Sequence, residues 1–183
     1  MASSERVEVI HDAERASIAL QPIRLKILER LEQPSSPTSL SKTLGIPRQH
    51  LNYHMRELEA AGLVEMVEEK RRGSVVERFY RSTARAYVIG PRAMGELRAD
   101  PAAIQDRFSA EYLIALGSRL IEDVADLDPA TQTLALETTI AFATDADRNS
   151  FSRELTASVA RLAATYHKED GEPFRIVVVG HPR

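Results

Sequence analysis

The feature that most constrains the fold is a pair of short helix patterns joined by a tight glycine turn. Ser36 followed by Pro37 forms an N-cap and first-turn pair, which predicts a helix from Pro37 to about Leu44. Gly45 ends that helix, and Pro47 stands near the start of the next one. Because the connection is so short, the two helices are expected to contact each other at a steep angle.

The second helix has one apolar face and ends at a glycine. Its apolar residues follow three- and four-residue spacing: Leu51, Met55, Leu58 and Ala61. Gly62 then predicts a left-handed C-terminal cap. Ser41, Gly45 and Leu51 have the spacing of a small residue, a turn glycine and a buried apolar residue in a helix-turn-helix. The sequence therefore predicts that motif over these two segments.

The polar side chains of the second helix are of types that recognise DNA bases. Those facing away from the apolar stripe are Arg48, Gln49, His50, Asn52 and Tyr53. The major groove is about 12 Å wide and accepts one α-helix, and within it arginine can bind guanine while glutamine or asparagine can bind adenine. We predict that these residues contact bases and that Arg56, one turn further on, contacts a phosphate. The alternative is a polar face that is simply solvated.

Two alternating segments follow and predict an antiparallel hairpin. Residues 63–69 and 75–82 alternate apolar and polar side chains, with Gly73 between them. Lys70, Arg71 and Arg72 belong to the predicted turn, residues 70–74, where they suit the DNA backbone or minor groove in a salt-dependent contact. A basic turn alone is uninformative. Placed directly after a polar helix of this kind, it predicts a DNA-binding domain.

The stretch from Leu20 to Tyr80 resembles the winged helix-turn-helix domain of ArsR-type transcriptional regulators. The resemblance rests on "LQPIRLKILERL", "SLSKTLGIPRQHLNYHMRELEAAGLV" and the later "FY". It implies a homodimeric regulator, a repressor in our interpretation, that binds double-stranded DNA at an inverted-repeat operator. It also implies that residues 48–50, 52 and 53 contact DNA. Unlike the metal-sensing members, the chain has no cysteine, and residues 102–127 contain no histidine.

The sequence offers little support for a metal site or for catalysis. His50 and His54 stand four residues apart, a spacing that can bind a metal, but the third ligand would have to be the remote Glu57. We favour His50 as a DNA contact and His54 as partly buried against the domain. The chain has no nucleophile elbow, phosphate-binding loop, dinucleotide turn or zinc-protease spacing. We expect no enzyme activity, no metal and no cofactor.

The second half predicts a long helix followed by a strand–helix–strand region. Residues 102–127 form an amphipathic helix pattern whose apolar face comprises Ile104, Phe108, Tyr112, Leu116, Leu120, Val124 and Leu127. Residues 131–144 and 174–180 have strand character, with a helix between them. The apolar face could pack on a second copy, or a pocket between these parts could bind a small-molecule effector. The sequence names no ligand.

The balance of charged residues also differs between the two halves of the chain. Residues 21–90 carry 12 Lys and Arg against 8 Asp and Glu, whereas residues 91–183 carry 10 against 15, and the whole chain has a net charge of −3. We predict an α+β protein with a winged helix-turn-helix domain at residues 1–90 and a dimerisation domain, which could also bind an effector, at residues 91–183. The basic part is the one expected to face DNA.

Two rival interpretations stay open. The same domain could dock a protein or an RNA, or the chain could sense a metal through His and Glu side chains. No apolar run is long enough for a membrane helix, and residues 1–17 lack the apolar stretch of a signal peptide. We therefore expect a cytoplasmic protein with no membrane partner.

Overall fold

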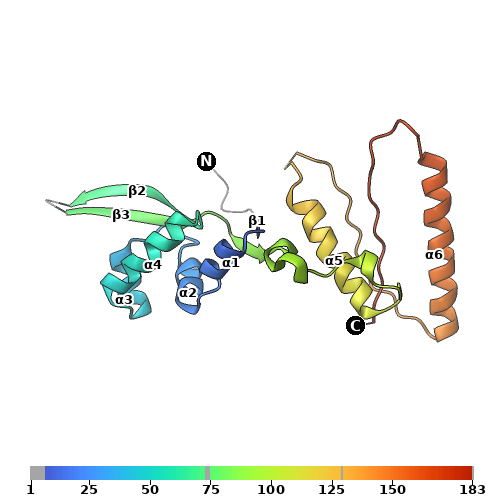
Figure 1. The fold of residues 1–183 in the computed structure, drawn as a ribbon, viewed down its shortest axis with the longest axis horizontal. Helices are drawn as coiled ribbons and strands as arrows, with labels where there is room; N and C mark the ends of the chain where they lie inside the picture. The colour runs from blue at the N-terminus through green and yellow to red at the C-terminus, as the bar shows by residue number, and fades with distance from the viewer. Residues whose placement is uncertain (1–6, 73–74, 129, 183) are drawn as a thin grey trace. The chain divides into compact units, whose positions relative to one another are not determined.

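The structure, a computed structural model, describes residues 7–72, 75–128 and 130–182 of the 183-residue chain. The chain divides into two units, Met1–Pro129 and Ala130–Arg183 (Figure 1). These two units are compact packing units. The predicted domains, residues 1–90 and 91–183, were defined by function, and that boundary stays a prediction. No helix in the described ranges is long and apolar enough to cross a membrane.

The first unit is built on helices packed around one core. Their bounds are α1 (Ala13–Ala19), α2 (Pro22–Arg30), α3 (Pro37–Leu44) and α4 (Arg48–Ala60). Proline opens α2 and α3, at a position where its missing N–H costs no helical hydrogen bond. Ile27, Leu31, Leu51 and Leu58 are fully buried where these helices meet. The predicted helices on either side of the glycine turn are confirmed.

Glycines in the left-handed conformation end both helices of the motif. Gly45 has φ 65° and closes α3, and the Ser41 hydroxyl donates to the Ile46 carbonyl across the turn at 2.6 Å. Gly62 also has φ 65°, and the residue after it donates its backbone N–H to the Leu58 carbonyl at 2.9 Å. That bond satisfies a carbonyl that the end of α4 would otherwise leave free.

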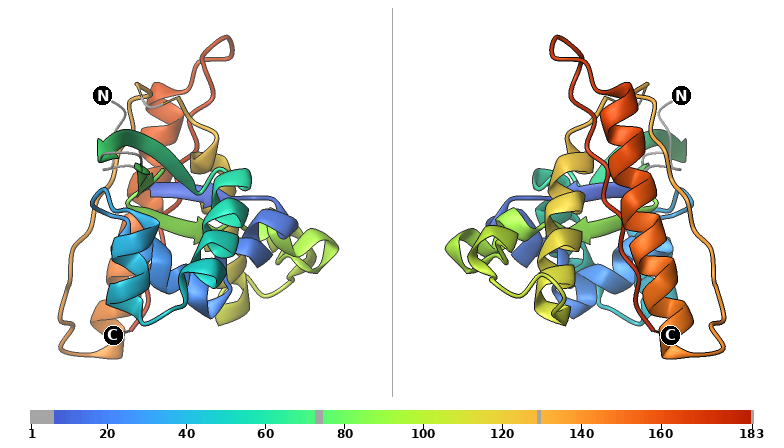
Figure 2. Two further views of the ribbon diagram at one scale, coloured as in Figure 1. Left: turned by 90° about the vertical axis from the view of Figure 1, so that its left-hand side faces the viewer. Right: turned by 90° about the vertical axis from the view of Figure 1, so that its right-hand side faces the viewer.

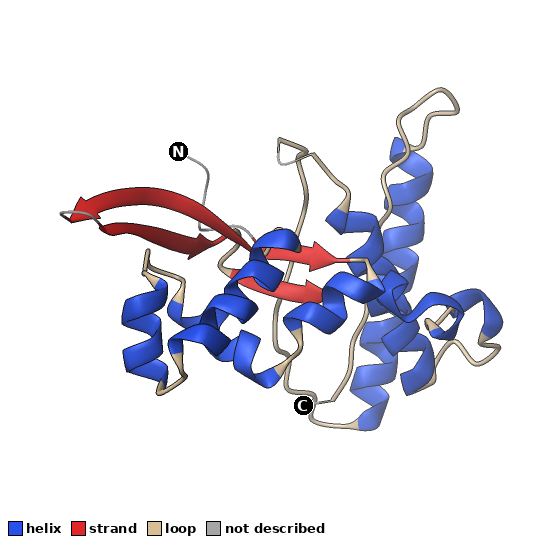
Figure 3. Ribbon diagram, turned by 60° about the vertical axis from the view of Figure 1, so that its left-hand side comes forward, coloured by secondary structure: helices blue, strands red, loops and turns tan. Residues whose placement is uncertain are grey.

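A long antiparallel hairpin follows α4 and is tied to the helices at its base. It comprises β2 (Val64–Arg72) and β3 (Val75–Ser82), and Figure 3 shows it extending beyond the helices. Ser35 and Tyr80 exchange two backbone hydrogen bonds of 2.9 Å, and the Ser36 hydroxyl donates to the Glu77 carboxylate at 2.5 Å. The predicted strands are confirmed, and these bonds fix the hairpin relative to α3.

A second, two-stranded sheet was not predicted from the sequence. Its strands β1 (Val7–Ile10) and β4 (Ala86–Ile89) pair in parallel and run side by side in Figure 2. Gly90 follows β4 and packs under the His11 ring, where an added Cβ would lie 2.6 Å from the ring Nδ1. Only glycine fits this close approach. The sheet joins the start of the chain to the segment that follows the hairpin.

The long helix of the first unit is shorter than predicted. Residues 102–127 were predicted to be helical throughout, but α5 spans Ala110–Ala125 and is preceded by the 3-10 turns η1 (Pro91–Leu97) and η2 (Pro101–Ala103). The Ser109 hydroxyl accepts the Tyr112 backbone N–H at 3.1 Å and so caps α5 at its start. Phe108, predicted on the helix face, therefore lies before the helix and is almost fully exposed.

The second unit contains one long helix and no assigned strand among residues 130–182. Helix α6 (Asp145–Tyr166) begins where predicted, with the Thr144 hydroxyl accepting the Asp147 N–H at 3.1 Å. The strands predicted at 131–144 and 174–180 are wrong: neither segment is assigned as a strand, and neither belongs to a sheet of the described residues. Alternation of side chains favours an extended backbone, but a strand also needs a partner to accept its hydrogen bonds.

Candidate nucleic-acid interface

Helix α4 turns a continuous polar face to solvent. Its apolar residues Leu51, Met55 and Leu58 are buried in the core. The predicted DNA-contacting residues of the helix are all exposed: Arg48, Gln49, His50, Asn52, Tyr53 and Arg56. Arg48 and Arg56 have no ion-pair partner in the described part of the chain, so their guanidinium groups are available to an external anion.

Half of these side chains line a groove of about 400 Å³ between α4, the start of α3 and the hairpin. Gln49, Asn52 and Arg56 follow one another along the helix at its edge. The remaining lining residues are Pro37, Met55, Glu59 and Tyr80. Arg48, His50 and Tyr53 do not line the groove. The polar side chains therefore surround the exposed part of α4 and do not form a single pocket. This arrangement is expected of a helix that inserts into a groove on the surface of its ligand.

The start of α4 is open. Its N-cap is Pro47, which forms no side-chain cap hydrogen bond, and its first turn contains no acidic residue. The first N–H groups of a helix have no partner within the helix, and the helix dipole gives this end a partial positive charge. Arg48 adds to that positive character. This end of the helix suits a negatively charged ligand.

The opposite end of α4 is held by Arg15 of α1. Its Nε donates to the Ala61 carbonyl at 2.7 Å, and its Nη2 donates to the Gly62 carbonyl at 3.2 Å. A cation here is favourable because the last carbonyls of a helix carry partial negative charge. Arg15 also pairs with Glu8 of β1, with 2.6 Å between Nη1 and Oε1. One side chain thus links α4 to the β1–β4 sheet.

Strand β4 and the preceding turn hold the same end of α4. The Tyr87 hydroxyl donates to the Leu63 carbonyl at 2.8 Å, and the Thr83 hydroxyl donates to the Gly62 carbonyl at 3.0 Å. Neither these residues nor Arg15 were predicted from the sequence. No local signal marks them, because each acts across a long sequence separation.

A buried arginine joins α2 to the middle of α4. Arg24 is 2% exposed, and its Nη2 lies 3.3 Å from Glu57 Oε2. Its other Nη donates to the Ile18 carbonyl at 3.3 Å. A sequence signal for this residue did exist, since Arg24 occupies the same helical face as Ile27 and Leu31. A basic residue in an apolar stripe indicates a buried polar contact.

The Arg24 guanidinium also affects the pKa of His54, one of the two histidines of α4. Burial lowers the pKa of His54, and the positive charges of Arg24 and, to a smaller extent, His50 lower it further. His54 is partly buried, as predicted, while His50 is exposed. Glu57, the candidate third ligand, is engaged by Arg24. Within the described residues, no three His, Asp or Glu side chains gather as a metal site would require.

The hairpin cations lie on a strand rather than on a turn. Lys70, Arg71 and Arg72 all belong to β2, and residues 73–74 of the predicted turn fall outside the described residues, as does the Arg72 side chain. Successive strand residues point to opposite faces, so Lys70 and Arg71 do not act on one side. Lys70 Nζ is 3.0 Å from Glu68 Oε2, while Arg71 is exposed and has no ion-pair partner in the described ranges.

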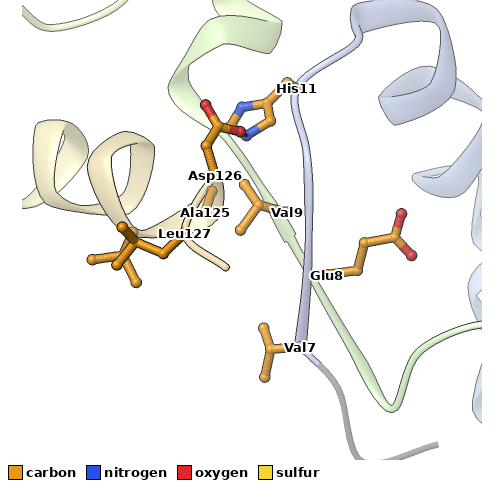
Figure 4. Close-up of a pocket in the computed structure, with 8 residues that line it drawn as sticks. Val7, Glu8, Val9, His11, Ala125, Asp126 and Leu127 are labelled. Carbon is orange, nitrogen blue, oxygen red and sulfur yellow. Dashed lines mark ion pairs between the residues drawn. The ribbon is translucent and has the colours of Figure 1, made fainter. Parts of the chain in front are cut away.

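A second groove of about 400 Å³ lies between β1 and the end of α5. Figure 4 shows Val7 and Val9 directed toward α5 and Glu8 on the opposite side of the strand, where it meets Arg15. His11 lies near Asp126, with 3.9 Å between Nε2 and Oδ1, and both its ring nitrogens are buried without a hydrogen bond. The groove thus combines apolar side chains of β1 and α5 with the polar pair His11 and Asp126.

Comparison with known proteins supports the motif. A family described as a helix-turn-helix domain matches residues 19–67, which run from the end of α1 into β2. No curated protein matches the chain. The chain therefore contains a helix-turn-helix domain, the kind of domain with which transcriptional regulators bind DNA.

Proposed function

We propose that the chain is a sequence-specific transcriptional regulator of the ArsR type that acts by binding DNA rather than by catalysis. In this proposal α4 enters the major groove, and the β2–β3 hairpin acts as a wing on the adjacent backbone. The observation that carries it is the exposed polar face of α4, which lies on a helix whose far end is held by Arg15. A helix held in this way presents its side chains in a fixed orientation.

The proposal assigns different tasks to the exposed residues. Arg48, Gln49, His50, Asn52 and Tyr53 contact base edges, and Arg56 contacts a phosphate. Among the hairpin cations, Arg71 is the best placed for the DNA backbone, because Glu68 already neutralises Lys70. Positively charged groups that neutralise phosphates supply affinity without sequence information, whereas the α4 side chains supply the specificity.

We further propose that the regulator is a homodimer on an inverted-repeat operator and represses by occluding a promoter. Helix-turn-helix dimers bind half-sites about one DNA turn apart, so the symmetry of the operator mirrors that of the protein. Exposed apolar residues on α5, such as Ile114 and Val124, are consistent with burial against another chain. A small-molecule effector, in this proposal, binds the groove at β1, which His11 and Asp126 line together.

The test is selection of binding sites from random duplex DNA, followed by affinity measurements with variants. An enriched palindrome supports the proposal. Arg48→Ala should then lose about 10- to 100-fold affinity for the selected site, since a good bidentate pair discriminates by about 1–3 kcal/mol. Its affinity for random DNA should fall much less. Arg107→Ala, which removes an exposed arginine far along the chain, is the matched control and should leave both affinities unchanged.

Two results would contradict the proposal. Equal loss of affinity by Arg48→Ala on selected and random DNA would show that Arg48 reads no base. Absence of any enriched sequence would favour the rival function, in which the same surface docks a protein or an RNA.

A further inference from the structure

The β2–β3 hairpin is attached to the rest of its unit both at its base and further out along β3. At the base, Ser35 and Tyr80 exchange two backbone hydrogen bonds of 2.9 Å. Further toward the tip, the Ser36 hydroxyl donates to the Glu77 carboxylate at 2.5 Å. Within the part of the chain that the structure describes, no hydrogen bond from the hairpin to the rest of the unit lies closer to the tip.

Glu77 differs from the other acidic residues of the hairpin in the partner that it takes. Those others pair with cations of the hairpin itself, at 2.9–3.3 Å: Glu65, Glu68 and Glu69. Across the strands Glu77 stands opposite Lys70, which pairs with Glu68. The Glu77 carboxylate accepts the Ser36 hydroxyl instead. A carboxylate near a proposed DNA contact opposes binding by its charge alone, so charge does not explain this residue.

Ser36 fixes the other end of this bond. It is 1% exposed and is the N-cap of α3, where its hydroxyl accepts the Ser39 N–H at 3.3 Å. One hydroxyl can form both bonds, because it has one donor hydrogen and two acceptor lone pairs. The turn at Gly45 joins α3 to α4. Glu77 is therefore linked through α3 to the proposed recognition helix.

Two attachments on one strand fix its direction, whereas a single attachment leaves a pivot. At about 3.3 Å per residue, Glu77 lies about 10 Å from Tyr80 along β3. Arg71 of β2 pairs with Val76, which is one residue further toward the tip and about 13 Å from Tyr80. If Tyr80 alone held the hairpin, a swing of about 10° would move Arg71 by about 2 Å. Hydrogen-bond lengths vary by only about 0.5 Å, so this swing exceeds what a contact from Arg71 to a phosphate tolerates.

We propose that Glu77 is a positioning residue for DNA binding. By accepting the Ser36 hydroxyl, its carboxylate holds the hairpin at the angle at which Arg71 reaches a phosphate while α4 lies in the major groove. Glu77 itself does not contact DNA. The inference rests on the proposed function, since it assumes that α4 and the hairpin bind one duplex together, and it adds the contact that fixes their relative orientation.

The experiment compares Glu77→Leu with its matched control Glu77→Gln in the full chain. Leucine removes both the charge and the acceptor, whereas glutamine removes the charge and keeps an acceptor oxygen for Ser36. Binding to the selected operator duplex is measured over a series of salt concentrations. One phosphate contact contributes about 0.9 to the slope of log K against log salt, which corresponds to about fivefold in affinity at about 0.15 M salt. Glu77→Leu should lose about one such contact, and Glu77→Gln should bind at least as tightly as the wild-type chain.

A double substitution tests whether Glu77 acts through Arg71. Because Arg71→Ala already removes the phosphate contact, adding Glu77→Leu should cause no further loss of affinity or of slope. General destabilisation of the domain would instead add to the loss in both backgrounds. Ser36→Ala removes the same hydrogen bond from its other partner, together with the cap of α3, and should reduce the slope as Glu77→Leu does. This variant tests the bond even if Glu77→Leu does not fold.

Two results would overturn the proposal. If Glu77→Leu and Glu77→Gln change the affinity and the slope equally, the hydrogen bond to Ser36 has no role in DNA binding. If the effects of Glu77→Leu and Arg71→Ala add, Glu77 does not act through Arg71. A chain that selects a palindrome and needs Arg48 to do so, but shows either result, keeps the proposed function and loses only this positioning role. Failure to select any sequence would refute the proposed function itself and this role with it.

Discussion

Arg15→Ala should destabilise the chain because it removes the cation that caps α4. Arg15 donates to two terminal carbonyls of that helix, at 2.7 Å to Ala61 and 3.2 Å to Gly62, and pairs with Glu8. A hydrogen bond from a charged group contributes about 1.5–3 kcal/mol, and a partly exposed ion pair contributes at most about 1 kcal/mol. Since Arg15 is partly exposed, we take the lower values and expect a loss of about 2–3 kcal/mol.

Thermal and urea unfolding measure this loss directly. For a chain of this length, each kcal/mol shifts Tm by about 2–4 °C, so Arg15→Ala should lower Tm by about 4–12 °C. Glu8→Gln removes the ion pair but keeps both bonds to α4, and it should cost less than about 1 kcal/mol. Arg15→Lys keeps the charge but not the two-carbonyl geometry, so its cost should lie between the two. If Arg15→Ala costs no more than Glu8→Gln, the bonds to α4 contribute nothing and the reasoning is refuted.

Two further predictions concern pH and salt. The pKa of His54 is lowered in the folded state, by burial first and then by Arg24, so the unfolded chain binds more protons just below the usual pKa of 6.5. The free energy of unfolding should therefore fall as pH decreases from about 6.5 toward the folded pKa. In urea unfolding, His54→Leu should abolish this dependence of stability on pH, whereas the control His167→Leu should keep it. An unchanged pH dependence in His54→Leu would contradict the assignment to His54. Arg71→Ala should reduce the slope of the logarithm of the DNA-binding constant against the logarithm of the salt concentration by about one unit. Lys70→Ala should reduce this slope less, because Glu68 already pairs with Lys70. Equal effects of the two substitutions would show that the Lys70–Glu68 ion pair does not matter when the protein is bound to DNA.

The helices of the motif were predictable because their signals are local. Ser36 and Pro37 start α3 within two residues, and Gly45 and Gly62 end α3 and α4 in the left-handed conformation that glycine adopts at no steric cost. The alternating pattern of the hairpin was equally local. The exposed face of α4 followed from the same periodicity, since the spacing of its buried residues determines which side chains remain outside.

The remaining structure depends on contacts between distant parts of the chain. Val7 pairs with Ala86 in the β1–β4 sheet, and neither segment carries a pattern that names the other. The converse error occurred at residues 131–144, where strand periodicity was present but no partner strand was. The start of α5 was misplaced because the Ser109 cap outweighed an apolar spacing that continued upstream of it. In each case the periodicity of the sequence concerned a single segment, whereas the secondary structure that formed depended on whether a hydrogen-bonding partner was present.

The contacts at the end of α4 suggest how binding could be regulated. Arg15 and Tyr87 tie this end to β1 and β4, and Arg92, directly after that sheet, donates to Asp126 at the end of α5 at 2.7 Å. The proposed recognition helix α4 and the helix α5 are therefore both attached to one small sheet. A ligand in the groove beside β1 would contact that sheet and α5 together. In the proposed dimer, its effect on DNA binding would follow from a changed spacing between the two copies of α4, without any contact to α4 itself.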